Sequence, residues 1–356
     1  MKIISLPPNR VWRTYLGGKK LDIIEEKDAP VDGHFPEDWI ASLTTAVNPG
    51  RDHLQQEGLS TIFVNGEEVL LKELVEKCPD KILGKEHIEK YGLSTSFLLK
   101  FLDSAIRLHI QCHPTIPFAK QFLNSNFGKT EGYYILGTRD DVENPFIYLG
   151  FQNPPTKEKL KEAIEKQDIE FLESCFEKIP VKKGDTFYVP GGLPHAIGEG
   201  VFMIEILEPT DLVVRIEFEK AGYTLPESAR FMNRGIDFAL SMFDYTPIPV
   251  ETVQCKYFIK EQTIVDKKNA KESEIFNSSI TECFRMNKLV VHGKYLLQKE
   301  SFYILIVTEG YGQISSGSDV YNVKFGDKFL VPAATETVEI NTNSSLEMIL
   351  AMPPKL

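Results

Sequence analysis

The sequence predicts a mainly β protein made of two related β-barrels with helical insertions, and two observations support this. First, 356 residues exceed the size at which one hydrophobic core usually stops growing, so two or more packed units are expected. Second, a phrase of Gly-Asp followed by apolar alternation and Val-Pro occurs at residues 181–200 and again at 322–340. Such a turn and strand are typical of a barrel wall, and their repetition indicates two barrels.

Helical spacing of apolar residues interrupts this β pattern in three places, residues 66–104, 155–179 and 227–245. The middle segment is one amphipathic helix or two short ones, and Pro247 and Pro249 end the last. The expected organisation is N-terminal strands joining the first barrel (1–65), a helical insertion (66–104), a catalytic metal-binding barrel (105–225), a helical connector (226–249) and a C-terminal barrel without metal ligands (250–356).

Charge and composition narrow the partners. The formal net charge is −11 with acids spread along the chain, which leaves no basic face for nucleic acid. A small anionic substrate is compatible with this charge, because a few convergent cations can outweigh a screened, diffuse surface charge. We find no signal peptide and no run of about 18 apolar residues that would span a membrane. Five scattered cysteines suit a reducing cytoplasm, so we expect a cytoplasmic monomer or dimer.

A polar strand face marks the first barrel as the place for chemistry. The alternation in RLHIQCHP puts His109, Gln111 and His113 on one side of a strand. Burying such groups without partners costs roughly 1 to 3 kcal/mol each, and a bound metal would offset that cost. The alternative is a polar core in which each group finds a hydrogen-bond partner.

Two further segments supply candidate ligands. Glu131 heads an apolar strand in GKTEGYYIL, and His195 follows the VPGGLP turn, whereas the second repeat has no histidine there. Together with Gln111 and His113 they form a mixed nitrogen and oxygen set that suits zinc but would also accept manganese, cobalt or iron. The spacing alone does not name the metal.

Four phrases resemble the motifs of the type I mannose-6-phosphate isomerases, a family of cupins. They are IQCHP, GKTEGYYIL, VPGGLPHAIG and VFMIEILEPTDLVVRIEF, which occur in family order between residues 105 and 218. The resemblance implies cupin-type (jelly-roll) barrels, one divalent ion per chain, most simply zinc, and interconversion of mannose 6-phosphate and fructose 6-phosphate through an enediol.

The resemblance also implies roles for individual residues. The family's metal ligands fall on Gln111, His113, Glu131 and His195. Its active-site lysine and arginine fall on Lys129 and Arg215, which would complement oxyanion and phosphate charge and otherwise would be solvated charges at the barrel rim. An acidic residue before the arginine falls on Glu205, a candidate proton-transfer group; a metal-bound hydroxide or His109 could serve as well. Glu205 could instead be an ion-pair partner of Arg215.

The chain departs from the family in its N-terminal third. VWRTYLGGKK stands where a W-G-G phrase is usual, PEDWIAS only loosely resembles E-x-W-x-x-S, and His109 replaces a serine. We expect His109 to contact the substrate and, if its ring charges near pH 6.5, to hold phosphate more tightly in acid; otherwise it is hydrogen-bonded within the barrel. The rival functions are a non-catalytic metal-containing sugar-binding cupin and an iron-dependent cupin oxygenase.

Overall fold

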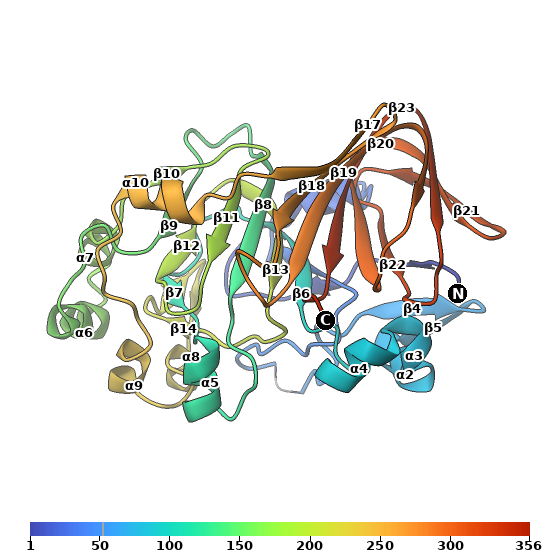
Figure 1. The fold of residues 1–356 in the computed structure, drawn as a ribbon. Helices are drawn as coiled ribbons and strands as arrows, with labels where there is room; N and C mark the ends of the chain where they lie inside the picture. Colours follow the sequence, from blue (N-terminus) through green and yellow to red (C-terminus); the bar gives the residue numbers. More distant parts are fainter. Residues whose placement is uncertain (52) are drawn as a thin grey trace.

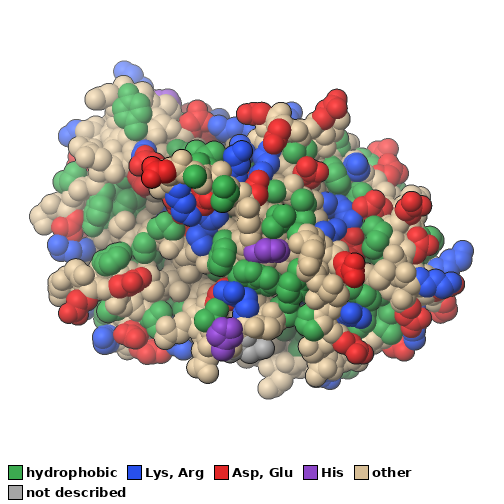
Figure 2. All heavy atoms as spheres, turned by 180° about the vertical axis from the view of Figure 1, so that it is seen from behind, with side chains coloured by type: hydrophobic (Ala, Val, Ile, Leu, Met, Phe, Trp, Pro, Cys, Tyr) green, Lys and Arg blue, Asp and Glu red, His purple; other side chains and the backbone are tan. Residues whose placement is uncertain are grey.

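The computed structural model describes residues 1–51 and 53–356. Figure 1 shows two β units side by side, with helices at the outer end of the first unit and along one side of the second. On the face drawn in Figure 2, acidic and basic side chains are interspersed, and neither sign covers the surface. Among the described residues, no helix has the length and apolar character needed to cross a membrane.

The first unit consists of two antiparallel sheets. The 5-stranded sheet has the order β10 (Ile179–Pro180), β9 (Phe146–Leu149), β12 (His195–Ile197), β7 (Gln111–Cys112) and β14 (Val214–Arg215). The 6-stranded sheet has the order β11 (Thr186–Val189), β8 (Glu131–Thr138), β13 (Val201–Leu207), β6 (Leu98–Asp103), β3 (Glu37–Ile40) and β2 (Arg10–Val11). Apolar side chains such as Ile135, Leu149 and Met203 fill the space between them.

The second unit is one 8-stranded sheet around an apolar interior. Its order is β1 (Ile4–Ser5), β22 (Lys328–Val331), β20 (Tyr303–Ser316), β23 (Val338–Met352), β19 (Arg285–Leu297), β18 (Ala270–Phe276) and β17 (Gln262–Lys267), with β21 (Asp319–Lys324) paired to β20. Register shifts interrupt the long pairings of β19, β20 and β23, and such irregularities allow long strands to bend into a barrel. Leu289, Leu305 and Met348 are among the fully buried side chains inside.

The repeated phrase forms the same element in both units, β11 in the first and β22 in the second. Val189 of β11 pairs with Glu131, and its counterpart Val331 of β22 pairs with Tyr303. A tyrosine therefore occupies the place of the carboxylate in the second barrel. This substitution explains in part why the metal-ligand pattern belongs to the first barrel alone.

Two N-terminal expectations need correction. The segment 66–104, expected to be helical, does contain α2 (Leu71–Lys77), α3 (Pro79–Ile82) and α4 (Lys85–Tyr91). However, it begins with strand β5 (Glu67–Leu70), which pairs with β4 (Thr61–Val64), and it ends with strand β6. All of β6 is buried, because it is a central strand covered on both faces and so lacks the alternation that identifies a strand. The N-terminal strands also do not all join the first barrel, since β1 pairs with β22 of the second.

The other helical segments are short. The middle segment forms the two-helix alternative, α6 (Lys157–Lys166) and α7 (Ile169–Ser174), separated by Gln167 in a left-handed conformation. The connector contains α8 (Glu227–Arg230) and α9 (Ile236–Leu240), and positive φ angles at Met232 and Asn233 interrupt it. The remaining elements are α1 (Lys19–Ile24), α5 (Ile116–Phe122), α10 (Val250–Thr252), the π-helix Val253–Tyr257 and the hairpin β15 (Glu219–Lys220) and β16 (Tyr223–Thr224).

Candidate metal centre and adjoining pocket

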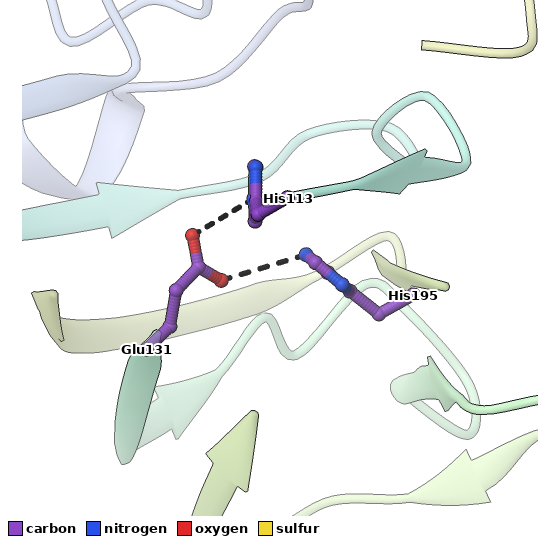
Figure 3. Close-up of side chains that lie close together, drawn as sticks. All are labelled: His113, Glu131 and His195. Carbon is purple, nitrogen blue, oxygen red and sulfur yellow. Dashed lines mark ion pairs between the residues drawn. The ribbon is translucent and has the colours of Figure 1, made fainter. Parts of the chain in front are cut away.

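Three strands of the first barrel bring together His113, Glu131 and His195 (Figure 3). His113 follows β7, while Glu131 and His195 begin β8 and β12. Nε2 of His113 lies 3.0 Å from Glu131 Oε1, and Nε2 of His195 lies 3.4 Å from Glu131 Oε2. Each residue is 1% exposed, and one potential ligand atom from each lies within 4.8 Å of the others. Among the described residues this is the cluster able to hold a metal ion.

Backbone carbonyls orient both imidazoles. Nδ1 of His113 lies 2.8 Å from the Leu212 oxygen, and Nδ1 of His195 lies 2.8 Å from the Leu193 oxygen. A carbonyl only accepts, so Nδ1 carries the proton and each Nε2 lone pair points into the cluster, as metal-binding histidines require. Burial first, and then the charge of Lys129, lower the pKa of His113 to about 3. Burial also lowers the pKa of His195, so both rings are in the neutral form that binds metals.

Gln111 lies beside these groups, because it is the register partner of His195. Its amide Nε2 lies 3.2 Å from His195 Nε2. The two ends of an amide are exchanged by a half-turn of the side chain, which would present Oε1 in the same place. Gln111 is thus within reach of the cluster as a fourth donor.

Glu131 provides the test of whether a cation fits. Its Oε1 is buried and has no hydrogen-bond partner of acceptable geometry within the described chain, whereas Oε2 accepts a bond of 2.6 Å from Tyr133. Burial raises the pKa of Glu131, but the nearby charge of Lys129 acts against burial, and the pKa lies well below the usual range. The two oxygens of this carboxylate each face one imidazole, Oε1 toward His113 and Oε2 toward His195. Such a carboxylate and two imidazoles form a donor set that fits a divalent metal.

A pocket adjoins the cluster, and Gln111 and Lys129 form part of its wall. Its charged lining comprises the cations Arg13, Lys100, Lys129 and Arg215 and the acids Glu37, Glu205 and Asp211. Such a concentration of buried charge beside a metal cluster is typical of a reaction site.

Ion pairs neutralise most of these charges. Lys100 Nζ lies 3.2 Å from Glu37 and 3.1 Å from Glu205. Arg13 lies 2.8 Å from Glu37 and 3.1 Å from Asp211. Lys129 lies 3.0 Å from Glu131.

Arg215 differs from the other three cations. Within residues 1–51 and 53–356 no carboxylate oxygen lies within 4.0 Å of its guanidinium. The alternative in which Glu205 pairs with Arg215 is therefore wrong, because Glu205 pairs with Lys100. Arg215 leaves a positive charge available to a ligand in the pocket.

Glu205 is the pocket acid with an unusual protonation equilibrium. Burial and the nearby charge of Glu131 raise its pKa to about 8, although Lys100 and Lys129 act in the opposite direction. Its side chain is 2% exposed. Without a metal, the equilibrium of this carboxyl group is therefore shifted toward the protonated form.

His109 lines the same pocket but does not belong to the metal cluster. Nδ1 lies 3.0 Å from the backbone oxygen of Glu217, and Nε2 lies 3.0 Å from the Thr14 hydroxyl. Burial and the charges of Arg215 and Lys220 lower the pKa of His109 to about 3. The expectation of a ring that charges near pH 6.5 is wrong, because the barrel removes water and places two cations nearby.

Sequence reasoning missed five polar residues of the pocket lining, Arg13, Tyr15, Glu37, Lys100 and Asp211. Signals for some of them were present. Arg13 and Glu37 lie inside the two N-terminal phrases that only loosely match the family. Lys100 is a single cation in the apolar run SFLLKFLD. We had assigned this run to a helical segment and so did not recognise it as a strand.

Comparisons with known proteins agree with this fold and site. Residues 274–353 match the family model "Mannose-6-phosphate isomerase, cupin domain". The mannose-6-phosphate isomerase ManA of Bacillus subtilis is 30% identical over 239 residues, which cover 66% of this chain and 68% of the relative. A crystal structure of the Bacillus subtilis mannose 6-phosphate isomerase has a TM-score of 0.75 at 23% identity and covers 99% of both chains. A mannose 6-phosphate isomerase bound with zinc and yttrium has a TM-score of 0.71 at 17% identity, with 100% of both chains covered.

The fold and site define a cupin with two barrels and a His-Glu-His cluster in the first. The chain belongs to the type I mannose-6-phosphate isomerase family, and it is an aldose-ketose isomerase of a sugar phosphate. The predicted family and fold class are thereby confirmed.

Proposed function

We propose that this isomerase interconverts mannose 6-phosphate and fructose 6-phosphate through an enediol, with one zinc ion held by Gln111, His113, Glu131 and His195. The observation that carries the proposal is the buried Glu131 carboxylate between two imidazoles, beside a charged pocket; its Oε1 has no hydrogen bond among the described residues. The names of the relatives support the substrate, and the zinc-bound relative supports the metal. We also propose that residues 105–225 supply the metal ligands of the catalytic barrel, which the strands β2, β3 and β6 complete, and that 250–356 with β1 form the barrel without metal ligands.

The metal would supply Lewis-acid polarisation or an activated water, either of which can provide several kcal/mol of transition-state stabilisation. The remaining requirements fall to side chains of this chain. Arg215 has no carboxylate partner among the residues that the structure describes and would bind anionic charge on the substrate. Lys129 would hydrogen-bond an oxygen that becomes negative in the enediolate.

Glu205 is the proposed proton-transfer group. The net reaction moves one proton from C2 to C1 of the aldose and one hydroxyl proton from O2 to O1, so a single carboxylate can accept and return the carbon proton. A divalent cation near Glu131 would lower the pKa of Glu205 from about 8 toward the range in which it accepts a proton at neutral pH. Lys100, 3.1 Å away, would hold the carboxylate in place.

His109 is proposed to shape the substrate end of the pocket as a neutral ring. Its bonds to Thr14 and the Glu217 carbonyl hold the ring against the pocket wall. Where the family usually has a serine, the larger ring reduces the space for a sugar. His109 would therefore act on substrate preference by shape.

Exchange of the C2 proton with deuterated solvent tests the proposal. With zinc-loaded protein, mannose 6-phosphate should exchange its C2 proton for deuterium and form fructose 6-phosphate. Chelation of the metal should stop both the exchange and the isomerisation. Saturable binding without exchange would indicate a sugar-binding cupin, and oxygen uptake with ferrous iron would indicate an oxygenase. Turnover of another sugar phosphate in preference to mannose 6-phosphate would overturn the substrate assignment alone.

A further inference from the structure

Lys328 is a buried cation of the second barrel that the proposed chemistry does not use. It is the first residue of β22, all of whose residues are buried. Its ammonium pairs with Asp38 of β3, and both side chains are only 5% exposed. Burying two charges is costly even when they are paired, so such a pair contributes little net stability but can specify one arrangement of the elements that carry it.

The pair lies between the two barrels, against the back of the 6-stranded sheet. Asp38 on β3 is the register partner of Phe101 on β6, and Lys328 Nζ lies 5.9 Å from the centre of the Phe101 ring. Around it, one continuous apolar core contains side chains of both barrels, including Phe101, Ile204, Leu330 and Ile349. Lys328 therefore touches two adjacent strands of the first barrel from behind.

The front of these two strands is the pocket wall. Successive residues of a strand point to opposite faces, so Glu37 and Lys100 stand on the opposite side from Asp38 and Phe101. Both line the pocket, and they pair at 3.2 Å. The Glu37 carboxylate also accepts hydrogen bonds of 2.5 Å from Tyr15 and 2.7 Å from Trp39.

Asp38 also fixes the chain segment that enters this wall. Its Oδ1 accepts a bond of 2.9 Å from the backbone NH of Asn9, which immediately precedes β2. That segment continues to Arg13 and Tyr15, which both bind Glu37. The Asp38 carboxylate thus binds Lys328 of the second barrel and the backbone of Asn9, which leads to the residues that bind Glu37.

We propose that Lys328 is a positioning residue for the isomerase site: through Asp38 and Phe101 it sets the placement of Glu37 and Lys100, and hence of Glu205. The second barrel would then contribute to catalysis without a metal or a substrate contact of its own. This inference rests on the proposed function, because it takes the pocket as the place of reaction.

The test compares Lys328→Met with Lys328→Arg in the full-length, zinc-loaded protein. The Met variant should lower kcat by about tenfold or more, with unchanged metal content. The change in KM should be smaller, because among the described residues neither Arg215 nor Lys129 forms an ion pair with Glu37. The Arg variant keeps the charge and should recover most of kcat. If Lys328→Met does not fold, Lys328→Gln, which can still donate a hydrogen bond to Asp38, replaces it with the same expected direction.

Lys299→Met is the matched control. Lys299 also pairs with a buried carboxylate, Glu272, but this pair lies within the second barrel. The Lys299→Met variant should be less stable than the wild type, but its kcat should change by less than about threefold. A folded Lys328→Met or Lys328→Gln protein with wild-type kcat would overturn the proposal, and so would an equal loss of kcat in Lys299→Met.

Tryptophan emission separates this inference from the function itself. The chain has 2 tryptophans, and the Trp39 indole donates to Glu37 Oε2, so in a Trp12→Phe background the emission reports on the Glu37 network. Lys328→Met should shift or quench it, and Lys299→Met should not. If the wild type isomerises no sugar phosphate, the proposed function fails, and the emission result alone decides whether Lys328 controls the wall. An unchanged spectrum would overturn that control.

Discussion

The ammonium of Lys129 lies 3.0 Å from Glu131 Oε1, the same oxygen that approaches the His113 imidazole. Because the two residues are two positions apart, both side chains lie on one side of the chain where β8 begins. The lysine is only 5% exposed. It therefore lies beside the proposed metal site and not at a solvated rim of the barrel. Its charge is available both to Glu131 and to an oxygen of a bound substrate.

Lys129→Met should lower kcat/KM by about tenfold or more without loss of metal, since one charge-assisted hydrogen bond contributes roughly 1.5 to 3 kcal/mol. Steady-state kinetics together with elemental analysis measure both quantities. Lys166→Met, which removes an exposed helical lysine paired with Glu162, is the control. Wild-type kinetics in Lys129→Met would show that the lysine is structural.

The protein should contain about one divalent ion per chain, and chelation should remove this ion and the activity together. His113→Ala and His195→Ala should each lower metal affinity by more than about 100-fold, because even the loss of an outer hydrogen-bond partner of a metal ligand costs 10- to 100-fold. Metal titration of each variant is the measurement. The exposed His292 provides the control variant His292→Ala; full activity of chelated wild type would contradict the metal site.

Glu205→Gln keeps the shape of the side chain but removes its proton chemistry. If Glu205 transfers the carbon proton, kcat and C2 exchange should both fall by about 100-fold or more. Glu272→Gln makes the same change at a buried carboxylate of the second barrel and should leave both rates close to wild type. Retained exchange in Glu205→Gln would assign proton transfer to another group.

The raised pKa of Glu205 also predicts a pH dependence of stability in the metal-free protein. The folded state keeps the proton up to a pKa of about 8, while the unfolded state releases it near the ordinary value of 4.5. The stabilisation that this group contributes is therefore fully present below the pKa of the unfolded state, and it is lost as the pH rises through the pKa of the folded state. The melting temperature of Glu205→Gln relative to wild type should rise by about 2 °C or more between these two pH values; a constant difference would contradict the shift.

His109 should remain neutral and in the Nδ1-protonated tautomer over the whole range of about pH 5 to 8. Nitrogen-15 NMR of the imidazole measures this directly, with the partly buried His34 as an internal reference. His109→Ser should change the ratio of kcat/KM for mannose 6-phosphate and other sugar phosphates without changing metal content. If the ratio stays constant, Arg13 and Tyr15 become the candidates for substrate preference.

The sequence by itself determined the two-barrel class, the family and the ligand candidates, because these depend on local patterns. Strand alternation showed that Gln111 and His113 share one face. The repeated Gly-Asp turn indicated a second barrel, whose repeat has no histidine at the position that corresponds to His195. Its motifs also identified Lys129, Arg215 and Glu205 as residues of one site.

Only the tertiary structure decided the charge state and partners of these groups. Contacts between residues far apart in the chain, such as Lys100 with Glu205 or Lys328 with Asp38, leave no periodic signal in a sequence. The pKa of His109 depends on burial and on Arg215 brought near by folding. Long-range electrostatics and desolvation exist only once the chain is packed, so no local pattern could have predicted them.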